Sequence, residues 1–160
     1  MIYNTTYDSP LGELLLLSDG TALTGLYFSG YCPACEGIAG ELPVFGEVKH
    51  WLDAYFQGED PSITFPLAPQ GTSFQNMVWD ILLTIPKGKT RSYGEIAREI
   101  AICMGKEKMS CQAVGQAVSR NPISIIIPCH RVIGSAGQLT GYASGLEKKR
   151  WLLNHEGVYL

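Results

Sequence analysis

The sequence predicts an α+β protein in which a small β-rich lobe precedes a mostly helical domain. β-branched and aromatic residues separated by turn signals dominate the first part of the chain, whereas apolar residues recur at helical spacing in the second. The charge also changes sign, because residues 1–71 carry one Lys against nine acidic residues and residues 72–160 carry eleven Lys or Arg against six. Residues 61–71 hold three prolines and a glycine, so we predict a lobe over 1–70, linker included, and a domain over 71–160.

Three short strands and one helix are expected in the lobe. The strands cover residues 2–7, 13–17 and 23–28, and turn residues separate them. Apolar residues then recur at helical spacing over residues 48–56, and Gly58 is expected to end this helix.

Helices dominate the expected domain. An amphipathic helix covers residues 74–82, and Ser92 with Glu95 forms a capping box that opens the next helix. Ser110 caps a further helix that ends near Pro122. This pair of short helices fits a DNA-binding helix-turn-helix, although two packed helices of any α-domain show the same pattern.

Two further segments complete the expected domain. The apolar run 123–127 indicates a buried extended segment. Residues 144–147 form a second capping box that opens the last helix, and Gly157 ends that helix.

Cys129 is the candidate nucleophile, because it follows the buried run and precedes His130. A cysteine attacks only as a thiolate, so it needs a base or a positive field. Neighbours in an extended segment point to opposite faces, so a bridging water or a bend would have to connect Cys129 with His130. His130 in turn needs an acid, for which Glu156 and His155 are both available. A Cys-His pair with a purely structural role remains the alternative.

Ordered blocks of residues surround Cys129 at consistent spacings. They cover residues 71–79, 85–95, 119–122, 128–134, 139–142 and 149–157. Together they resemble the O6-alkylguanine-DNA alkyltransferases, the methylated-DNA–protein-cysteine methyltransferase family, over nearly all of residues 71–160. The first 60 residues resemble the ribonuclease-H-like N-terminal lobe of that family more loosely.

The resemblance implies a role for each residue of a catalytic group. Cys129 would accept the alkyl group, His130 would deprotonate it through a water, and Glu156 would hold His130. Asn121 would tie the end of the DNA-facing helix to the backbone beside the active site. Tyr93 would donate a hydrogen bond to the departing guanine.

The resemblance also implies contacts with a flipped base and with DNA. Tyr142 would close over the base, and the backbone at Val132 and at Ala143–Ser144 would read the edge of the base. The remaining positions implied to contact DNA are Gln112, Ala113 and Arg120. The family often carries an inserting arginine where this chain has Gln112, so affinity would rest more on Arg91, Arg98, Arg120 and the lysines.

The implied function is a single irreversible transfer of an alkyl group from O6-alkylguanine in duplex DNA to Cys129. O4-alkylthymine is a second candidate lesion. A monomer in the cytoplasm is expected, with no cofactor, no metal and no membrane segment. A lesion-binding protein that transfers nothing is one alternative, although such proteins lack the cysteine. A small thiol hydrolase built on Cys129, His130 and Glu156 is the other.

The remaining four cysteines receive no role in this function. Cys32 and Cys35 form a single CxxC, for which two free loop cysteines are a simpler interpretation than zinc, because zinc needs two more ligands. Cys103 and Cys111 are expected to be packing residues.

Overall fold

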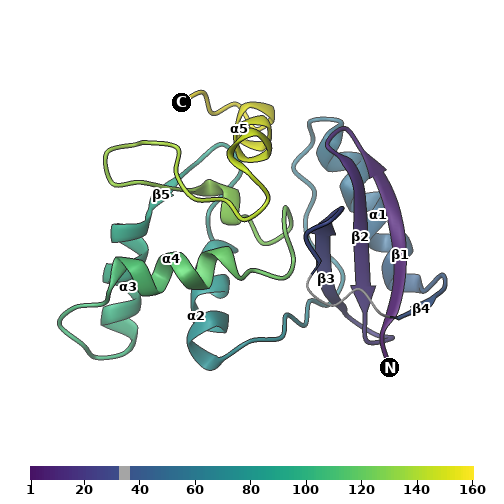
Figure 1. The fold of residues 1–160 in the computed structure, drawn as a ribbon, viewed down its shortest axis with the longest axis horizontal. Coiled ribbons are helices and arrows are strands. Elements are labelled where there is room, and N and C mark those ends of the chain that lie inside the picture. The colour runs from purple at the N-terminus through teal and green to yellow at the C-terminus, as the bar shows by residue number, and fades with distance from the viewer. Residues whose placement is uncertain (33–36) are drawn as a thin grey trace. The chain divides into compact units, whose positions relative to one another are not determined.

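The computed structural model describes residues 1–32 and 37–160 and divides them into two compact units (Figure 1). The first unit holds Met1–Gln70 together with Pro122–Ser124. The second holds Gly71–Asn121 and Ile125–Leu160. A sheet dominates the first unit and helices dominate the second, so the α+β prediction is confirmed.

The described residues of the first unit form a four-stranded sheet and one helix. They are β1 (Tyr3–Ser9), β2 (Gly12–Ser18), β3 (Leu23–Phe28), β4 (Ile38–Ala39) and α1 (Pro43–Phe56). The strand order is β3-β2-β1-β4, with antiparallel pairs except for the parallel β1–β4 pair. Leu14 and Leu16 of β2 are fully buried, and α1 packs on β1 and β2 across one face of the sheet (Figure 1).

Three residues from late in the chain bind the edge of this sheet. The Leu26 N–H donates to the Pro122 carbonyl at 2.8 Å, and the Ser124 N–H donates to the Leu26 carbonyl at 3.0 Å. Pro122–Ser124 thus continue the hydrogen bonding of β3. The following residues, Ile125 onward, belong to the second unit.

Four helices, one 3₁₀ helix and two short strands make up the second unit. They are α2 (Ser73–Leu82), β5 (Arg91–Ser92), α3 (Tyr93–Cys103), α4 (Cys111–Ser119), η1 (Cys129–Arg131), β6 (Val132–Ile133) and α5 (Leu146–His155). Packing of α4 against both α2 and α3 produces the helix-turn-helix (Figure 1). Trp79 Nε1 donates to the Ala117 carbonyl at 2.9 Å, which fixes α2 against α4. No helix of residues 1–32 and 37–160 is long and apolar enough to cross a membrane.

Side-chain caps set the helix starts in the second unit. Ser92 accepts from the Glu95 N–H at 3.1 Å while the Glu95 carboxylate accepts from the Ser92 N–H, so the predicted capping box is confirmed. Ser110 caps α4 as predicted. The capping box predicted at 144–147 is wrong, because the N-cap of α5 is Gly145, which has a φ of 105° and no side-chain bond.

Two other predictions from the sequence are corrected. Residues 123–127 are buried, but only Ile123 makes a β-bridge, and residues 124–126 form a turn in which Ile125 has a φ of 71°. A short apolar run indicates that a segment is buried but does not determine its backbone conformation, which explains why an extended segment was predicted. Cys103 and Cys111 are exposed and not packed, because Cys103 is the last residue of α3 and Cys111 is the first residue of α4.

The pairing of β5 with β6 was not predicted, and it positions the site. Arg91 pairs with Val132 and Ser92 with Ile133 in a parallel ladder. Strand β5 leads directly into Tyr93 of α3, and β6 follows directly on η1. The ladder therefore brings the start of α3 beside the segment that carries Cys129.

Replacing Gly71 with Ala tests the packing at the start of the second unit. A Cβ there would lie 2.4 Å from the Trp79 ring and 2.7 Å from Gln75 Oε1. Because Trp79 is buried and hydrogen-bonded, we expect Gly71→Ala to lower the free energy of unfolding in urea by about 1–3 kcal/mol. Gly94→Ala in α3 is the control, since its Cβ meets nothing closer than 3.8 Å and alanine favours a helix. Equal effects of the two substitutions would contradict the packing argument.

Candidate active site

The backbone turns sharply just before Cys129. Pro128 has φ −83° and ψ 66°, and the Cys129 N–H donates to the Ile127 carbonyl at 2.8 Å, which is an inverse γ-turn. The 3₁₀ helix η1 follows, so Cys129 and His130 are not in the extended conformation that the sequence suggested. Both side chains are buried. The bend that the sequence argument allowed for is this turn.

Asn121 fixes the other end of the same loop. Its side-chain amide donates to the Ile127 carbonyl at 2.8 Å, and the residue is buried. Asn121 directly follows the C-cap of α4, Arg120. One side chain therefore joins the end of α4 to the backbone two residues before Cys129.

A buried carboxylate joins His130 and Arg131. His130 Nε2 and Glu156 Oε2 lie 2.7 Å apart. Arg131 reaches both oxygens of the same carboxylate, with Nε donating to Oε1 at 2.8 Å and an NH2 donating to Oε2 at 3.0 Å, and it also donates to the Ile85 carbonyl. The alternative acid, His155, stacks instead on Trp151.

This arrangement sets the tautomer of His130. A carboxylate accepts the proton on Nε2, so Nδ1 of the neutral ring is left as a base. Nδ1 is buried and has no hydrogen-bond partner among the residues that the structure describes. It is therefore available to receive a proton.

The charges around the pair keep the histidine neutral and the carboxylate ionised. Burial lowers the pKa of His130, and Arg131 and Lys149 act in the same direction against the pull of Glu156. Burial alone would raise the pKa of Glu156, but His130 and Arg131 outweigh it and hold that pKa well below its usual range. At neutral pH the site thus holds a neutral imidazole on an anionic carboxylate.

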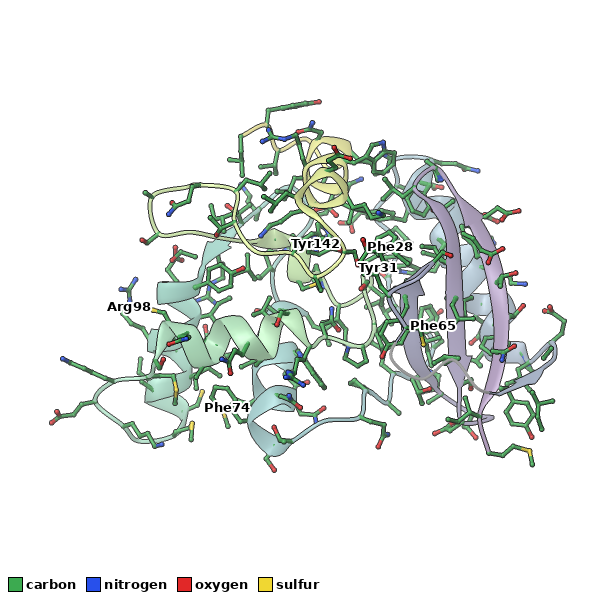
Figure 2. All side chains as sticks on the ribbon, in the orientation of Figure 1. Phe28, Tyr31, Phe65, Phe74, Arg98 and Tyr142 are labelled. Carbon is green, nitrogen blue, oxygen red and sulfur yellow. The ribbon has the colours of Figure 1, made fainter. Side chains whose placement is uncertain are left out.

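The Cys129 sulfur is protonated at rest. Burial raises the pKa of its thiol, whereas hydrogen bonding to Asn121, the charge of Lys149 and hydrogen bonding to Tyr142 oppose this increase. A thiol of this kind becomes a nucleophile only when a base removes its proton. Figure 2 shows Tyr142 in the loop between β6 and α5.

Tyr93 and Lys149 meet at the same two carbonyl groups. The Tyr93 hydroxyl lies 3.4 Å from the carbonyls of Thr140 and Gly141, and Lys149 Nζ donates to them at 2.5 Å and 3.0 Å. Nζ also lies 5.9 Å from the centre of the Tyr93 ring. Gly141 has a φ of 62°, and a Cβ on it would lie 3.0 Å from the Tyr93 oxygen, so glycine suits this close contact.

An open groove of about 490 Å³ runs along α4. Gln112 and Gly115 line it from α4, and Tyr93, Thr140 and Gly141 line it from the facing segments. The groove therefore extends from α4 to Tyr93.

The other residues singled out from the sequence lie at varying depth. Val132 is buried in β6 and Ser144 is buried before α5. Ala113 is half-buried, whereas Arg120 and Ala143 are exposed. The structure thus places Asn121 and Tyr142 against Cys129 and holds the next residue, His130, against Glu156. It places Gln112, Arg120 and Ala143 on the surface.

Sequence reasoning missed the roles of Arg131 and Lys149. Both lie inside the blocks that carry the family resemblance, but their charge was counted only toward DNA binding. The one available signal was position, since Arg131 directly follows the Cys-His pair. Burial of Lys149 has no signal in the sequence, because α5 carries three consecutive basic residues.

The CxxC prediction falls partly outside the described residues. Cys35 is not described, and Cys32 is half-buried. Within residues 1–32 and 37–160, no three His, Cys, Asp or Glu side chains are grouped as a metal site requires.

Two family models together match most of the chain. The 6-O-methylguanine DNA methyltransferase DNA binding domain matches residues 73–158, and the ribonuclease-like domain of the same family matches residues 2–69.

Individual relatives match along nearly their whole length. A methylated-DNA–protein-cysteine methyltransferase of Mycobacterium leprae is 48% identical over 158 residues, covering 98% of this chain and 93% of the relative. The protein of that name from Methanosarcina mazei is 54% identical over 158 residues, covering 97% of each chain. The crystal structure of Mycobacterium tuberculosis OGT in complex with DNA is similar with a TM-score of 0.86 and 44% identity, covering 96% of this chain and 92% of that one. From these matches, the chain belongs to the 6-O-methylguanine DNA methyltransferase family.

Proposed function

We propose that the protein repairs DNA by transferring the alkyl group of O6-alkylguanine to its own Cys129, once per molecule. The observation that carries this proposal is a buried thiol that is followed in the chain by a buried neutral histidine, whose Nε2 is held by a buried carboxylate. Family membership supports the same reaction, and relatives carry the name methylated-DNA–protein-cysteine methyltransferase. The free thiol that the reaction consumes suits the reducing cytoplasm.

Proton transfer comes first in the proposed reaction. His130 Nδ1 takes the Cys129 proton through a bridging water, which leaves a thiolate and an imidazolium. Glu156 stabilises the imidazolium through the 2.7 Å contact with Nε2. Arg131 keeps Glu156 ionised, so the carboxylate does not take the proton itself.

Alkyl transfer then follows in one displacement. The thiolate attacks the alkyl carbon, an S–C bond forms, and the bond from that carbon to the guanine O6 breaks. Guanine leaves with the electron pair, and a donor must stabilise its negative charge. We assign this donor role to Tyr93, which faces the groove along α4. The product is a thioether, which water does not cleave readily, so each molecule acts once.

The target base must leave the duplex to reach a buried sulfur, at a cost of a few kcal/mol. In the proposed complex Tyr142 closes over the flipped base. Backbone groups at Val132 and at Ala143–Ser144 read its edge. Helix α4 enters the duplex with Gln112 and Ala113, and Arg120 contacts the backbone at the other end of α4. A monomer suffices for this reaction, and O4-alkylthymine is a second candidate lesion.

The alternatives differ from this proposal in measurable ways. A lesion binder has no use for the buried Cys129 and His130 pair. A thiol hydrolase would release its product repeatedly and has no use for a helix-turn-helix in a domain rich in Lys and Arg.

Intact mass after reaction with a duplex that contains O6-methylguanine tests the proposed function. We expect a single gain of one methylene, about 14 Da, located on Cys129, with no second turnover. Cys129→Ala should show no gain, and Cys103→Ala, which removes an exposed cysteine at the end of α3, should behave like the wild type. Binding without a gain would favour the lesion binder, and repeated turnover of an ester would favour the hydrolase.

Replacing Arg131 tests how the buried carboxylate tunes the base. Arg131 lowers the pKa of His130, so Arg131→Met should raise that pKa and move the acid limb of the pH–rate profile upward by about half to one pH unit. Transfer from DNA should therefore slow more at pH 6 than at pH 8, as single-turnover rates would report. Arg131→Lys keeps the charge and should shift the limb less, whereas Arg150→Met on the exposed side of α5 should not shift it. A uniform loss at every pH would mean that Arg131 only supports the fold.

The salt dependence of DNA binding tests which cations face the duplex. Arg91 is paired with Glu95 and Glu99, so it is less available than the sequence suggested. Arg98, Lys106 and Lys108 are exposed, form no ion pair with any described residue and line one groove of about 400 Å³ (Figure 2 shows Arg98).

We expect Lys106→Gln and Lys108→Gln each to reduce the slope of log affinity against log salt by about 0.9. Lys49→Gln in the first unit, where Lys49 pairs with Glu41, is the control. Unchanged slopes in both variants would place the duplex elsewhere.

A further inference from the structure

Lys149 is a fully buried cation that the proposed reaction does not use. Its relative exposure is 0%. An ammonium leaves water at a large cost unless an opposite charge meets it. Yet no carboxylate of the described residues lies within ion-pairing distance of Nζ, and the printed acceptors are the carbonyls of Thr140 and Gly141.

These two carbonyls do not account for a buried charge. Thr140 and Gly141 are exposed residues, so water can reach this part of the loop. The neutral hydroxyl of Tyr93 also lies 3.4 Å from both carbonyl oxygens. A neutral donor could therefore satisfy these carbonyls at a lower desolvation cost than a buried ammonium.

The titratable groups that face Lys149 come from η1 and α3. Cys129 and His130 interact with it electrostatically, and the Tyr93 ring lies 5.9 Å from Nζ. Of these three groups, His130 becomes a cation during the reaction and Tyr93 stays neutral. Cys129 is the group that becomes an anion. The missing counter-charge of Lys149 thus forms when Cys129 loses its proton.

We propose that Lys149 is a positioning residue that stabilises the thiolate of Cys129 through its charge and holds the Thr140–Gly141 backbone below Tyr93. No bond to Lys149 forms or breaks, since the thiol proton goes to His130 and the ammonium keeps its own three protons. This inference rests on the proposed function, because it concerns the nucleophile of that reaction.

The charge of Lys149 is present only over part of the pH range. Burial lowers the pKa of Lys149 to about 8, and the negative charge of Cys129 opposes this decrease. The ammonium therefore supports the thiolate below about pH 8 and loses this effect above it. Because the unfolded chain holds the proton up to a higher pH, the charged lysine lowers the stability of the fold at neutral pH. A residue that costs stability and contacts no acid fits a functional role.

The pH dependence of cysteine alkylation by iodoacetamide tests this inference without DNA. We expect Lys149→Met to move the midpoint of Cys129 alkylation upward by about one pH unit, which slows the reaction about tenfold at pH 7. The difference from the wild type should shrink above about pH 8, because the wild-type Lys149 loses its charge there. Lys149→Arg should keep the wild-type midpoint. Lys148→Met, one position earlier on α5, is the matched control and should also keep it.

Thermal melts distinguish the loss of the Lys149 charge from a general loss of folding stability. Lys149→Met is expected to be at least as stable as the wild type at pH 7, and Lys149→Gln is a second neutral variant that keeps a hydrogen-bond donor. Both neutral variants should shift the midpoint alike. An unshifted midpoint in both, or a rate lowered equally at every pH, overturns the inference and leaves Lys149 a structural residue.

Methyl transfer from a duplex with O6-methylguanine is measured on the same proteins. If the wild type transfers no methyl group while the iodoacetamide midpoint still shifts, the proposed function fails and the link between Lys149 and Cys129 stands. If the wild type transfers the methyl group and both neutral variants do so with its pH profile, the inference about Lys149 fails alone.

Discussion

The buried carboxylate of Glu156 joins several segments of the second unit. Glu156 caps α5, accepts two hydrogen bonds from Arg131 and lies 2.7 Å from His130. Arg131 also reaches the Ile85 carbonyl, so the segment after α2, the turn η1 and the last helix all converge on this group. Removing one partner of a buried ion pair commonly costs about 3–5 kcal/mol, because the other charge is left uncompensated. His130, the proposed base, is therefore oriented by the same interaction that joins three parts of the unit.

The buried charges form two sets with different electrostatic balance. Glu156 has a permanent cation in Arg131, and a second cation appears on His130 only when the thiol is deprotonated. Lys149 has no such partner at rest among the described residues. In the proposed reaction, deprotonation of Cys129 places a negative charge near Lys149 and a positive charge beside Glu156 at the same time. Charge separation within the site is thus compensated at both ends.

Local signals in the sequence predicted the fold class, the three long strands and the caps of α3 and α4, whereas the residues proposed to act with Cys129 were implied by the family resemblance. Ser92 and Glu95 were predictable because a capping box is a contact between residues three apart. The ladder between β5 and β6 joins two-residue strands about forty positions apart, and no pattern of period two can arise in so short a strand. Residues 123–127 were predicted as extended because hydrophobicity reports burial alone. The Gly145 cap displaced the expected Ser144 cap because a backbone with positive φ, which only glycine adopts readily, starts α5.

The hydrogen bonds of Leu26 with Pro122 and Ser124 have a consequence for how this protein can be divided. In the loop between Asn121 and Cys129, residues 122–124 form hydrogen bonds at the edge of the sheet and belong to the first unit. A cut at residue 70 therefore does not yield two self-contained pieces, because the second piece would keep a segment whose backbone partners belong to the first. Replacing the first unit with that of a relative would also replace β3, the strand to which that loop is hydrogen-bonded. Substitutions in β3 and in residues 122–124 should consequently be correlated among relatives, because the two segments form one structural module although they lie far apart in the chain.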